Sequence, residues 1–427
     1  MNAKSATEKV QDCNSRPMFL QFIRHARAAA LVLCAALLLP AGAFALGFRV
    51  PNQDAEAIAR GNAFAATADN PSAIYYNPAG ITQLQGESVQ FGVHALSINS
   101  FFDSSAGRGS SESKFNVAPV PQLFITCSPT NMPFSFGVGL YAPYGLSVDW
   151  PVGSPFRSDQ VFYGRLSYIT LNPVAAWKIN DQLSLAVGPT INYAQVVLRR
   201  GVGPNPFGIS EYDFRGDDFA FGFTAGILWH PVEKWSFGAS YHSPTTMNFG
   251  GHSAVSGGFS GSSPSSAEAP FAQFILGGVS FRPTTNWNFE ADVDWTDWHS
   301  LKTVHFISPG FTGTPLSDVP FPFNWKSSVL LEFGGTRYLD KGYFASAGFF
   351  FSENSTTSPD FTPIVPDTDL YVGSVGFGHK GKVWDWTLAA QIITGPPREV
   401  NSVNNPTANG SYQWINGSLD FSVRYHF

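Results

Sequence analysis

The feature that most constrains the fold of this chain is a two-residue alternation of apolar and polar side chains. In the segment SLDFSVRYHF (418–427), every second residue from Leu419 to Phe427 is apolar, and the residues between them are polar. Successive side chains of a β-strand point to opposite faces, so the pattern predicts a strand with one apolar and one polar face. Such a strand needs a paired neighbour and an apolar medium on one side. We therefore predict that 418–427 pairs with the first strand and closes a sheet on itself.

The same alternation recurs often enough to build a large sheet. Clear segments lie at 89–95, 134–140, 183–193, 219–229, 287–295 and 384–392, and weaker ones at 117–126, 164–178, 235–242, 271–281, 325–338, 343–351 and 369–379. Short polar turns fall at 128–133, 180–181, 231–234, 283–286, 339–342 and 380–382, and long loops fall at 99–116, 143–163, 194–217, 243–270, 299–324, 352–368 and 394–416. About fourteen strands joined by alternating short turns and long loops are typical of an up-and-down outer-membrane barrel.

The composition agrees with strands that face lipid on one side. Only 13% of the residues are charged, where a soluble domain carries about 25%, while 15% are aromatic and the mean hydropathy is −0.03. A soluble β-sandwich would bury its apolar faces in a core, and the poverty of charge argues against that alternative. The sequence predicts an all-β fold, a transmembrane up-and-down antiparallel β-barrel of about fourteen strands, which must close because lipid offers no hydrogen-bond partners.

The first 45 residues have the features of a secretory signal peptide. Five basic residues precede the apolar stretch AAALVLCAALLLPAGAFALG (28–47), which Pro40 interrupts and which contains the small-x-small site Ala43-Phe44-Ala45. We predict cleavage before Leu46, with an uncleaved anchor, or a start at Met18, as the alternatives. The leader has a net charge of +3 and the whole chain −6, so the mature chain would carry −9, which argues against nucleic-acid binding. Cys127 alone would remain, so no internal disulfide is expected.

Residues 46–86 separate the leader from the barrel, predicted over 87–427, and show no alternation. The stretch contains LGFRVPNQDAEAIARGNAFAATADNPSAIYYNPAGITQLQG and is too apolar to extend freely into water. A barrel of about fourteen strands has a lumen too wide for its own side chains to fill. We therefore predict an N-terminal hatch that plugs the lumen; a periplasmic extension that binds a partner is the alternative.

At this point the sequence resembles the FadL family of outer-membrane transporters for long-chain fatty acids, with its TodX-like branch for aromatic hydrocarbons. NPSAIYYNPAGITQL looks like the family's plug, and YAPYGLSVDW, LNPVAAWKINDQLSLAVG, VDWTDWHSL, FNWKSSVLLEFGGTRYLD and the aromatic C-terminus are similar in the same order. The resemblance covers essentially the whole mature chain. It implies a monomeric fourteen-stranded barrel, assembled by the barrel-assembly machinery in an outer membrane of lipid and lipopolysaccharide. It also implies ligand entry from outside and sideways exit beside a kinked third strand.

Candidate site residues follow partly from the resemblance and partly from the residues. The resemblance assigns the hatch motif to Asn77, Pro78 and Ala79. Gly137 and Gly139 lie in the third strand, where their composition permits the kink.

Ligand contacts are predicted from apolar residues where a porin would be polar, and from charges suited to a carboxylate. Apolar lumen positions include Phe124, Phe274 and Phe350, which could instead pack the hatch. Phe156 and Phe162 lie in a long loop that could form an apolar landing groove or simply pack on other loops. Arg165 and Lys326 could bind a fatty-acid head group or form ordinary rim ion pairs.

Sequence patterns of enzymes and cofactor sites are missing from the chain. There is no GxSxG and no HExxH, and one mature cysteine excludes CxxC. Asp292, Asp294, Asp297 and His299 could hold a divalent cation, but a polar lumen lining explains them as well. A barrel lipase would need a Ser-His pair that the sequence does not identify. We predict no enzyme activity, no metal and no cofactor. The predicted function is passive uptake of hydrophobic compounds; a structural or adhesive barrel, or a nonspecific porin with a static plug, is the alternative.

Overall fold

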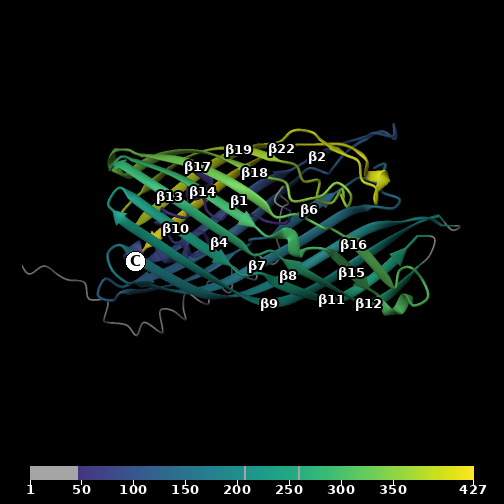
Figure 1. The fold of residues 1–427 in the computed structure, drawn as a ribbon, viewed down its shortest axis with the longest axis horizontal. Helices are drawn as coiled ribbons and strands as arrows, with labels where there is room; N and C mark the ends of the chain where they lie inside the picture. Colours follow the sequence, from purple (N-terminus) through teal and green to yellow (C-terminus); the bar gives the residue numbers. More distant parts are fainter. Residues whose placement is uncertain (1–46, 206–207, 258–259) are drawn as a thin grey trace, which may run out of the picture.

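A computed structural model describes residues 47–205, 208–257 and 260–427, and its strands form one closed antiparallel barrel of fourteen strands (Figure 1). Several barrel strands are divided into two pieces by a short break. The pieces are β1 (Gly86–Ile98), β2 (Ser100–Ser104), β3 (Ser110–Glu112), β4 (Asn116–Ser128), β5 (Phe134–Tyr141), β6 (Gly145–Asp149), β7 (Val161–Lys178), β8 (Leu183–Asn205), β9 (Gly208–Val232), β10 (Trp235–His242) and β11 (Thr245–Ser256). They continue with β12 (Gly261–Phe271), β13 (Phe274–Thr284), β14 (Trp287–Thr296), β15 (Thr303–Ile307), β16 (Asp318–Pro322), β17 (Ser328–Tyr338), β18 (Tyr343–Ser352), β19 (Leu370–Lys380), β20 (Trp384–Thr394), β21 (Arg398–Val400) and β22 (Gly410–His426).

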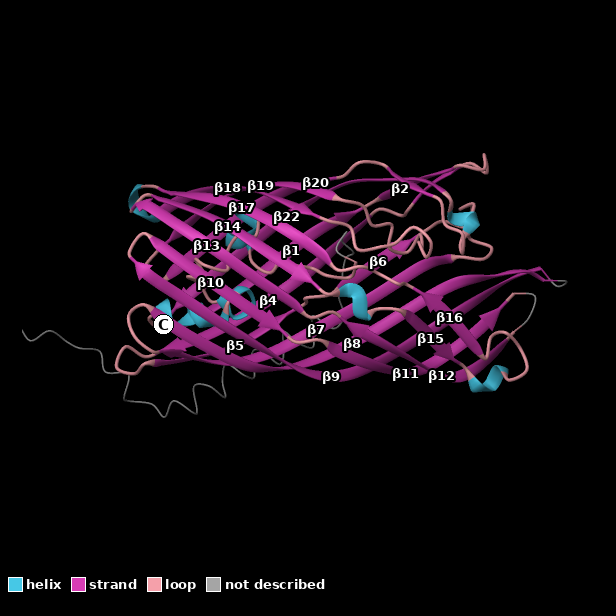
Figure 2. Cartoon of the chain, viewed as in Figure 1, coloured by secondary structure: helices cyan, strands magenta, loops and turns pink. Residues whose placement is uncertain are grey.

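In the described part of the chain, helices are few and short (Figure 2). They are α2 (Ala55–Ala59), α3 (Ala73–Tyr76) and the 3-10 turns η1 (Pro78–Gln83), η2 (Trp298–Ser300), η3 (Pro309–Phe311), η4 (Asp340–Gly342) and η5 (Pro406–Ala408). Within the described ranges no helix is long and apolar enough to cross a membrane. The predicted signal peptide lies outside the described residues.

The last strand closes the barrel against the first, as the alternation in 418–427 predicts. β22 pairs antiparallel with β1 from Ser88↔His426 to Leu96↔Ser418, and β1 pairs with β4 on its other side. The amide of Phe427 donates to the Glu87 carbonyl oxygen at 3.0 Å. The ring of paired strands is complete, which excludes the alternative of a two-sheet sandwich.

The two faces of the wall differ in polarity as expected. On the outer face, Phe221 is 75% exposed and Leu419 is 71% exposed, although both are large and apolar. On the inner face, Asp420 and Ser422 are buried. An outward apolar face on a closed barrel is stable only in lipid, so the barrel spans a membrane.

Short turns and the C-terminus lie at one end of the barrel, and the long connections lie at the other (Figure 1). The predicted loops 194–217 and 243–270 are wrong in part, because β8, β9, β11 and β12 continue through them. β8 and β9 stay paired up to Asn205↔Gly208. In this part of β9 the outward residues Asp213 and Arg215 are polar, whereas the inward residues Tyr212 and Phe214 are buried and aromatic, so the strand lacks the outward apolar face that marks a membrane strand.

The N-terminal segment, residues 47–85, is folded inside the barrel. α2 packs against β18, β19, β20 and β22, while η1 packs against β7, β8 and β9 on another side of the wall. Nearly every residue from Arg49 to Ile81 is buried. This arrangement is consistent with the predicted hatch and contradicts a free periplasmic extension for the described part of the segment.

Candidate functional site

Two carboxylates on the inner face of β14 hold the N-terminal segment by its backbone. One oxygen of Asp292 accepts hydrogen bonds from the amides of Phe64 and Ala65, both at 2.8 Å. Glu290 accepts from the next two amides at 2.7 and 3.1 Å. A buried backbone amide left without an acceptor costs about 1–3 kcal/mol, so these four contacts contribute to the attachment of the segment.

A third β14 carboxylate binds a buried arginine of the segment. Arg49 donates to Asp294 at 2.5 Å and to the Thr296 hydroxyl at 2.6 Å, and its guanidinium lies 3.6 Å from the centre of the Phe274 ring. Asp292 and Asp294, which we considered above as possible metal ligands, therefore bind the N-terminal segment. Among the described residues no three His, Cys, Asp or Glu side chains are arranged to hold a metal ion.

The Asn-Pro-Ala motif lies where the segment meets the wall. The Asn77 side chain donates to the carbonyl oxygens of Ala65, at 2.8 Å, and of Ile227 on β9, at 2.9 Å. Its oxygen accepts from the amide of Ala79 at 3.2 Å and so caps η1. Pro78 is the first residue of η1, a position that proline favours. The motif thus joins two parts of the segment to the wall.

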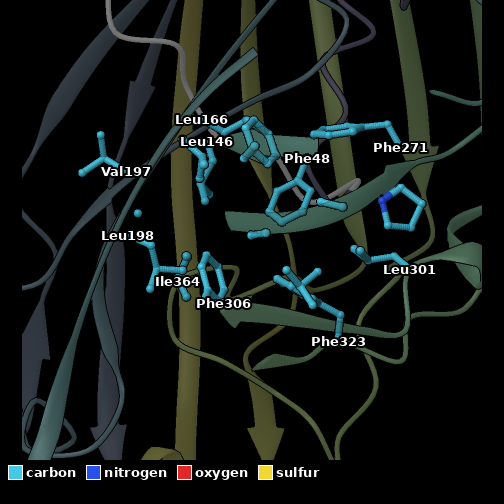
Figure 3. Close-up of a pocket in the computed structure, with 17 residues that line it drawn as sticks. Phe48, Leu146, Leu166, Val197, Leu198, Phe271, Leu301, Phe306, Phe323 and Ile364 are labelled. Carbon is cyan, nitrogen blue, oxygen red and sulfur yellow. The ribbon is translucent and has the colours of Figure 1, made fainter. Parts of the chain in front are cut away.

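An apolar cavity (Figure 3) is lined in part by residues of the long loops, such as Leu301 and Ile364, so it lies toward the long-loop end of the barrel. Its empty volume, including space open to solvent, is about 570 Å³. Side chains from the wall, the segment and two loops line it; they include Phe48, Leu166, Leu198, Phe271, Phe306 and Ile364. None of its seventeen lining residues has a side chain that forms hydrogen bonds or carries charge.

One wall of this cavity is formed by the β18–β19 loop, residues 353–369, which folds into the barrel mouth. Ile364 of this loop lines the cavity, and the Trp150 indole donates to the Pro363 carbonyl oxygen at 2.8 Å. Asp367 is buried in the same loop, where its carboxylate accepts from the Ser355 amide at 2.6 Å. Burial raises the pKa of Asp367 to about 8, even though the Ser355 amide and the Arg398 guanidinium act in the opposite direction.

The third barrel strand is broken beside the cavity. β5 ends at Tyr141 and β6 begins at Gly145, and both pair with β7. On the other side, the described ladder between β4 and β5 stops at Leu123↔Leu140, and among the described residues the start of β4 is hydrogen-bonded to β6 only through the Asn116 amide, which donates to the Ser147 hydroxyl at 3.0 Å. Residues 48–50 occupy the edge that is left, through bonds from the Val50 amide to the Pro143 oxygen (2.8 Å) and from the Gly145 amide to the Phe48 oxygen (2.7 Å).

The predicted kink position needs correction. Gly137 and Gly139 lie in the regular part of β5, paired with both neighbours, and the break falls at 142–144. A Cβ atom at Gly137 would lie 2.7 Å from Ile74 Cδ1, and one at Gly139 would lie 2.8 Å from Ile74 Cγ2. The two glycines therefore make room for a side chain of the N-terminal segment.

A second cavity, with an empty volume of about 300 Å³ including space open to solvent, lies next to the break. Tyr141, Pro143 and Tyr144 line it on one side. Hydroxyl or amide side chains, most of them from β7, β8, β9 and β11, line the rest together with Phe223, His242 and Phe274. Phe271 of the first cavity contacts Tyr144 and Tyr168 of the second, with ring centres 5.1 and 4.9 Å apart. Three aromatic rings thus separate the two cavities.

Three predicted lumen phenylalanines pack against the N-terminal segment rather than around the apolar cavity. Phe124 lies beside Ile74 at Gly139, and Phe350 belongs to a buried cluster with Val50. Phe274 stacks under Arg49 and also lines the second cavity. Phe124 and Phe350 therefore pack against the N-terminal segment, which was the alternative to ligand contact given above.

The other predicted contacts lie away from the cavity. Phe156 packs on Phe102 and Trp150, and Phe162 lies 3.5 Å under the Arg157 guanidinium. Lys326 is exposed and pairs with Glu353 at 2.7 Å. It therefore forms an ordinary rim ion pair, which was the alternative to binding a fatty-acid head group.

Arg165 lies on the outward face of β7, because its neighbours Gly164 and Leu166 line the cavity and successive side chains of a strand alternate. The cavity residues themselves, among them Val196, Leu198 and Ala267, are missing from the prediction. Their one sequence signal is the run Val196-Val197-Leu198, which breaks the alternation of its strand because both faces are apolar.

The fold and the cavity together define a class: a membrane β-barrel whose lumen is occupied by its own N-terminal segment and holds an apolar cavity beside a break in the wall. Residues 36–392 match the family model described as outer membrane protein transport protein (OMPP1/FadL/TodX). The chain belongs to this family, and it is an outer-membrane protein.

Named relatives and solved structures agree with this assignment. The chain is 26% identical to outer membrane protein P1 of Haemophilus influenzae over 276 residues, which span 53% of this chain and 59% of that protein. It is 20% identical to the long-chain fatty acid transport protein of Escherichia coli strain K12, over 80% of this chain and 86% of that one.

Among solved structures, a FadL homologue of Pseudomonas aeruginosa has a TM-score of 0.79 at 19% identity, covering 89% of this chain and 100% of that one. The Ralstonia pickettii toluene transporter TbuX has a TM-score of 0.68 at 15% identity, covering 88% and 99%. At these identities the structures show a shared fold. Two of these proteins, the Escherichia coli protein and TbuX, are named as transporters.

Proposed function

We propose that this protein takes up small hydrophobic compounds passively across the outer membrane. The observation that carries the proposal is the apolar cavity inside the barrel, next to a break in the third strand. A water-filled pore would be lined by polar side chains, and seventeen apolar lining residues are the opposite of that lining.

The proposed route has three parts. A ligand enters at the long-loop end, binds in the apolar cavity and leaves sideways into the bilayer at the break. Residues 47–85 act as the hatch, which blocks the axial route toward the short-turn end. Sideways exit suits an apolar solute, because it moves from one apolar environment into another without crossing water.

The relatives support the same kind of cargo. Their names include a long-chain fatty acid transport protein and a toluene transporter, which share a hydrophobic solute. A structural or adhesive barrel does not need an apolar cavity, and a nonspecific porin needs an open aqueous lumen where this protein has a packed segment.

Several properties complete the proposal. Residues 1–45 are a cleaved signal peptide, the barrel-assembly machinery inserts the mature chain among lipid and lipopolysaccharide, and the barrel works as a monomer. It binds no nucleic acid, uses no cofactor and catalyses no reaction.

Uptake by cells tests the function directly. A strain that lacks the gene should take up labelled hydrocarbons or fatty acids more slowly than the same strain carrying the gene. Ala267→Phe places a ring in the cavity, and we expect it to abolish the gain while the folded barrel persists in the membrane. Asn77→Ala should alter uptake through the hatch. Equal uptake with and without the gene across a panel of hydrophobic compounds would refute the proposal.

A further inference from the structure

Three arginines lie together on the outer face of the barrel wall, on neighbouring strands (Figure 1). Arg165 of β7 and Arg215 of β9 both face outward, and the same residue of β8, Val197, pairs with each of them. Arg199 lies two residues further along β8, on the same face, and pairs with Asp213 of β9. We call Arg165, Arg199 and Arg215 the arginine cluster.

The level of the arginine cluster follows from the residues below it. On β8 and β9 the outward residues are apolar or aromatic from Leu183↔Trp229 up to Tyr193↔Phe219. Ten residues at about 3.4 Å each, tilted by about 40°, give a height of about 26 Å, which matches the apolar band of an outer-membrane barrel. Arg215 lies four residues beyond Phe219 toward the long-loop end, which is the outer side of such a barrel. The cluster therefore lies at the level of the lipid head groups of the outer leaflet.

One carboxylate holds two of the guanidinium groups side by side. Asp213 accepts a hydrogen bond from Nε of Arg199 at 2.9 Å, and from Nε and Nη2 of Arg215 at 3.0 and 3.1 Å. These contacts use one N–H group of Arg199 and two of Arg215, whereas each guanidinium has five. The side chains of Arg199 and Arg215 are 39% and 62% exposed. Donors thus remain on both arginines for a ligand that approaches from the head-group layer.

The arginine cluster keeps a positive charge when its acidic neighbours are counted. Asp213 and Asp217 are the outward carboxylates of β9 at this level, so the three arginines leave a net charge of +1. Two further acidic residues border the cluster, and each is bound by a basic residue outside it: Asp149 by Lys114 and Glu211 by Arg157, both at 2.7 Å. Ion pairs between exposed side chains are weak, so an incoming phosphate can share the donors that Asp213 now uses.

We propose that the arginine cluster binds the phosphate groups of lipid A, the phosphorylated glycolipid that anchors lipopolysaccharide in the outer leaflet. Guanidinium groups bind phosphate oxygens through paired hydrogen bonds. The cluster spans three strands, about 10 Å, which is wider than one phosphate group and suits a head group that carries two. Directly below, Phe219 and Phe221 are 61% and 75% exposed and offer a surface to the acyl chains. This inference concerns the lipid neighbours of the barrel and does not depend on the solute that the barrel transports.

Binding of defined lipids to the full mature protein tests the site. Native mass spectrometry in detergent gives the dissociation constants of bisphosphorylated lipid A, of the same lipid without phosphates, and of phosphatidylglycerol. A double variant, Arg199→Gln with Arg215→Gln, removes two cations from the exposed face. Each basic residue at an anionic lipid surface changes the affinity about fivefold, so the double variant should bind bisphosphorylated lipid A about thirtyfold more weakly. Its affinity for the lipid without phosphates should not change.

Two single variants separate lipid binding from a structural role. Arg337 also faces outward, but it lies over the Trp287 ring at the short-turn end, so Arg337→Gln should leave lipid A binding unchanged. Asp213→Asn keeps the arginines and adds one positive charge, so it should strengthen lipid A binding about fivefold. Arginines that serve only the ion pair with Asp213 would give no such gain.

Two results would overturn the inference. The first is equal binding of bisphosphorylated lipid A by the wild type and by the double variant, with equal melting temperatures. The second is a wild-type affinity for bisphosphorylated lipid A within threefold of that for the lipid without phosphates or for phosphatidylglycerol, because acyl chains or any anionic head group would then explain the binding.

Discussion

Asp292 offers the sharpest test of how the N-terminal segment is held. Its carboxyl group accepts hydrogen bonds from two backbone amides at 2.8 Å, and a buried amide left without an acceptor costs about 1–3 kcal/mol. Taking about 1.5 kcal/mol for each amide gives a loss of about 3 kcal/mol on Asp292→Ala. That loss makes local release of the segment about a hundredfold more frequent.

Hydrogen exchange measured by mass spectrometry on the purified barrel reads this change directly. The amides of residues 60–68 should lose about a hundredfold of their protection in Asp292→Ala, while the β8–β9 ladder exchanges as in the wild type. Asp292→Asn keeps a neutral acceptor oxygen, so we expect a loss of only about tenfold. If exchange of 60–68 in Asp292→Ala stays within threefold of the wild type, the carboxylate does not anchor the segment.

Three further predictions concern the hatch, the loop and the wall. The Thr82 and Ser184 hydroxyl oxygens are 2.8 Å apart, so a double cysteine variant at these positions should form a disulfide that stops uptake until it is reduced. Equal uptake rates with the disulfide oxidised and reduced would show that this end of the hatch need not move. The pKa of Asp367 is raised, so the β18–β19 loop is most stable below about pH 4 and loses stability as the pH rises to about 8. Proteolysis of this loop should therefore accelerate over that range in the wild type. An Asp367→Asn variant with the same pH dependence of proteolysis as the wild type would contradict this. A Cβ atom at Gly334 would lie 1.9 Å from a backbone oxygen of the N-terminal segment, whereas a Cβ atom at Gly277 would have no atom within 4 Å. Gly334→Ala should therefore lower the melting temperature of the barrel, and Gly277→Ala should not. Equal melting temperatures of the two variants would refute the close packing at Gly334.

The barrel could be predicted from the sequence because each strand that crosses lipid needs an apolar outward face, which appears as a two-residue alternation. The alternation in 418–427 and in 219–229 exists because one face meets lipid and the other meets the polar lumen, and both segments pair as expected. In the upper part of β9 the alternation is inverted, because Asp213 and Arg215 face outward beyond the apolar band while Tyr212 and Phe214 are buried inside the barrel. A strand without an outward apolar face does not match the pattern of a membrane strand, and the sequence therefore predicts a loop there.

The cavity is harder to predict because its residues come from strands far apart in the chain. Leu166, Val196 and Phe271 each occupy an inward position that could equally pack the N-terminal segment, as Phe124 does. Whether an inward apolar residue lines a cavity or packs a hatch depends on where the hatch ends. Arg165 illustrates the other limit, since a shift of one position along a strand moves a side chain to the opposite face.

The unequal length of the strands gives the molecule a sloping rim. β9 has 25 residues, whereas β18, β19 and β20, toward the other side of the ring, have 10, 11 and 11. The residues from 208 to 218, at about 3.4 Å each and tilted by about 40°, raise the β8–β9 side by roughly 28 Å over the apolar band. The rim is therefore high on the β8–β9 side and low over β18, β19 and β20, where the loop bearing Ile364 lies, and we expect a solute from the water to enter over that low side.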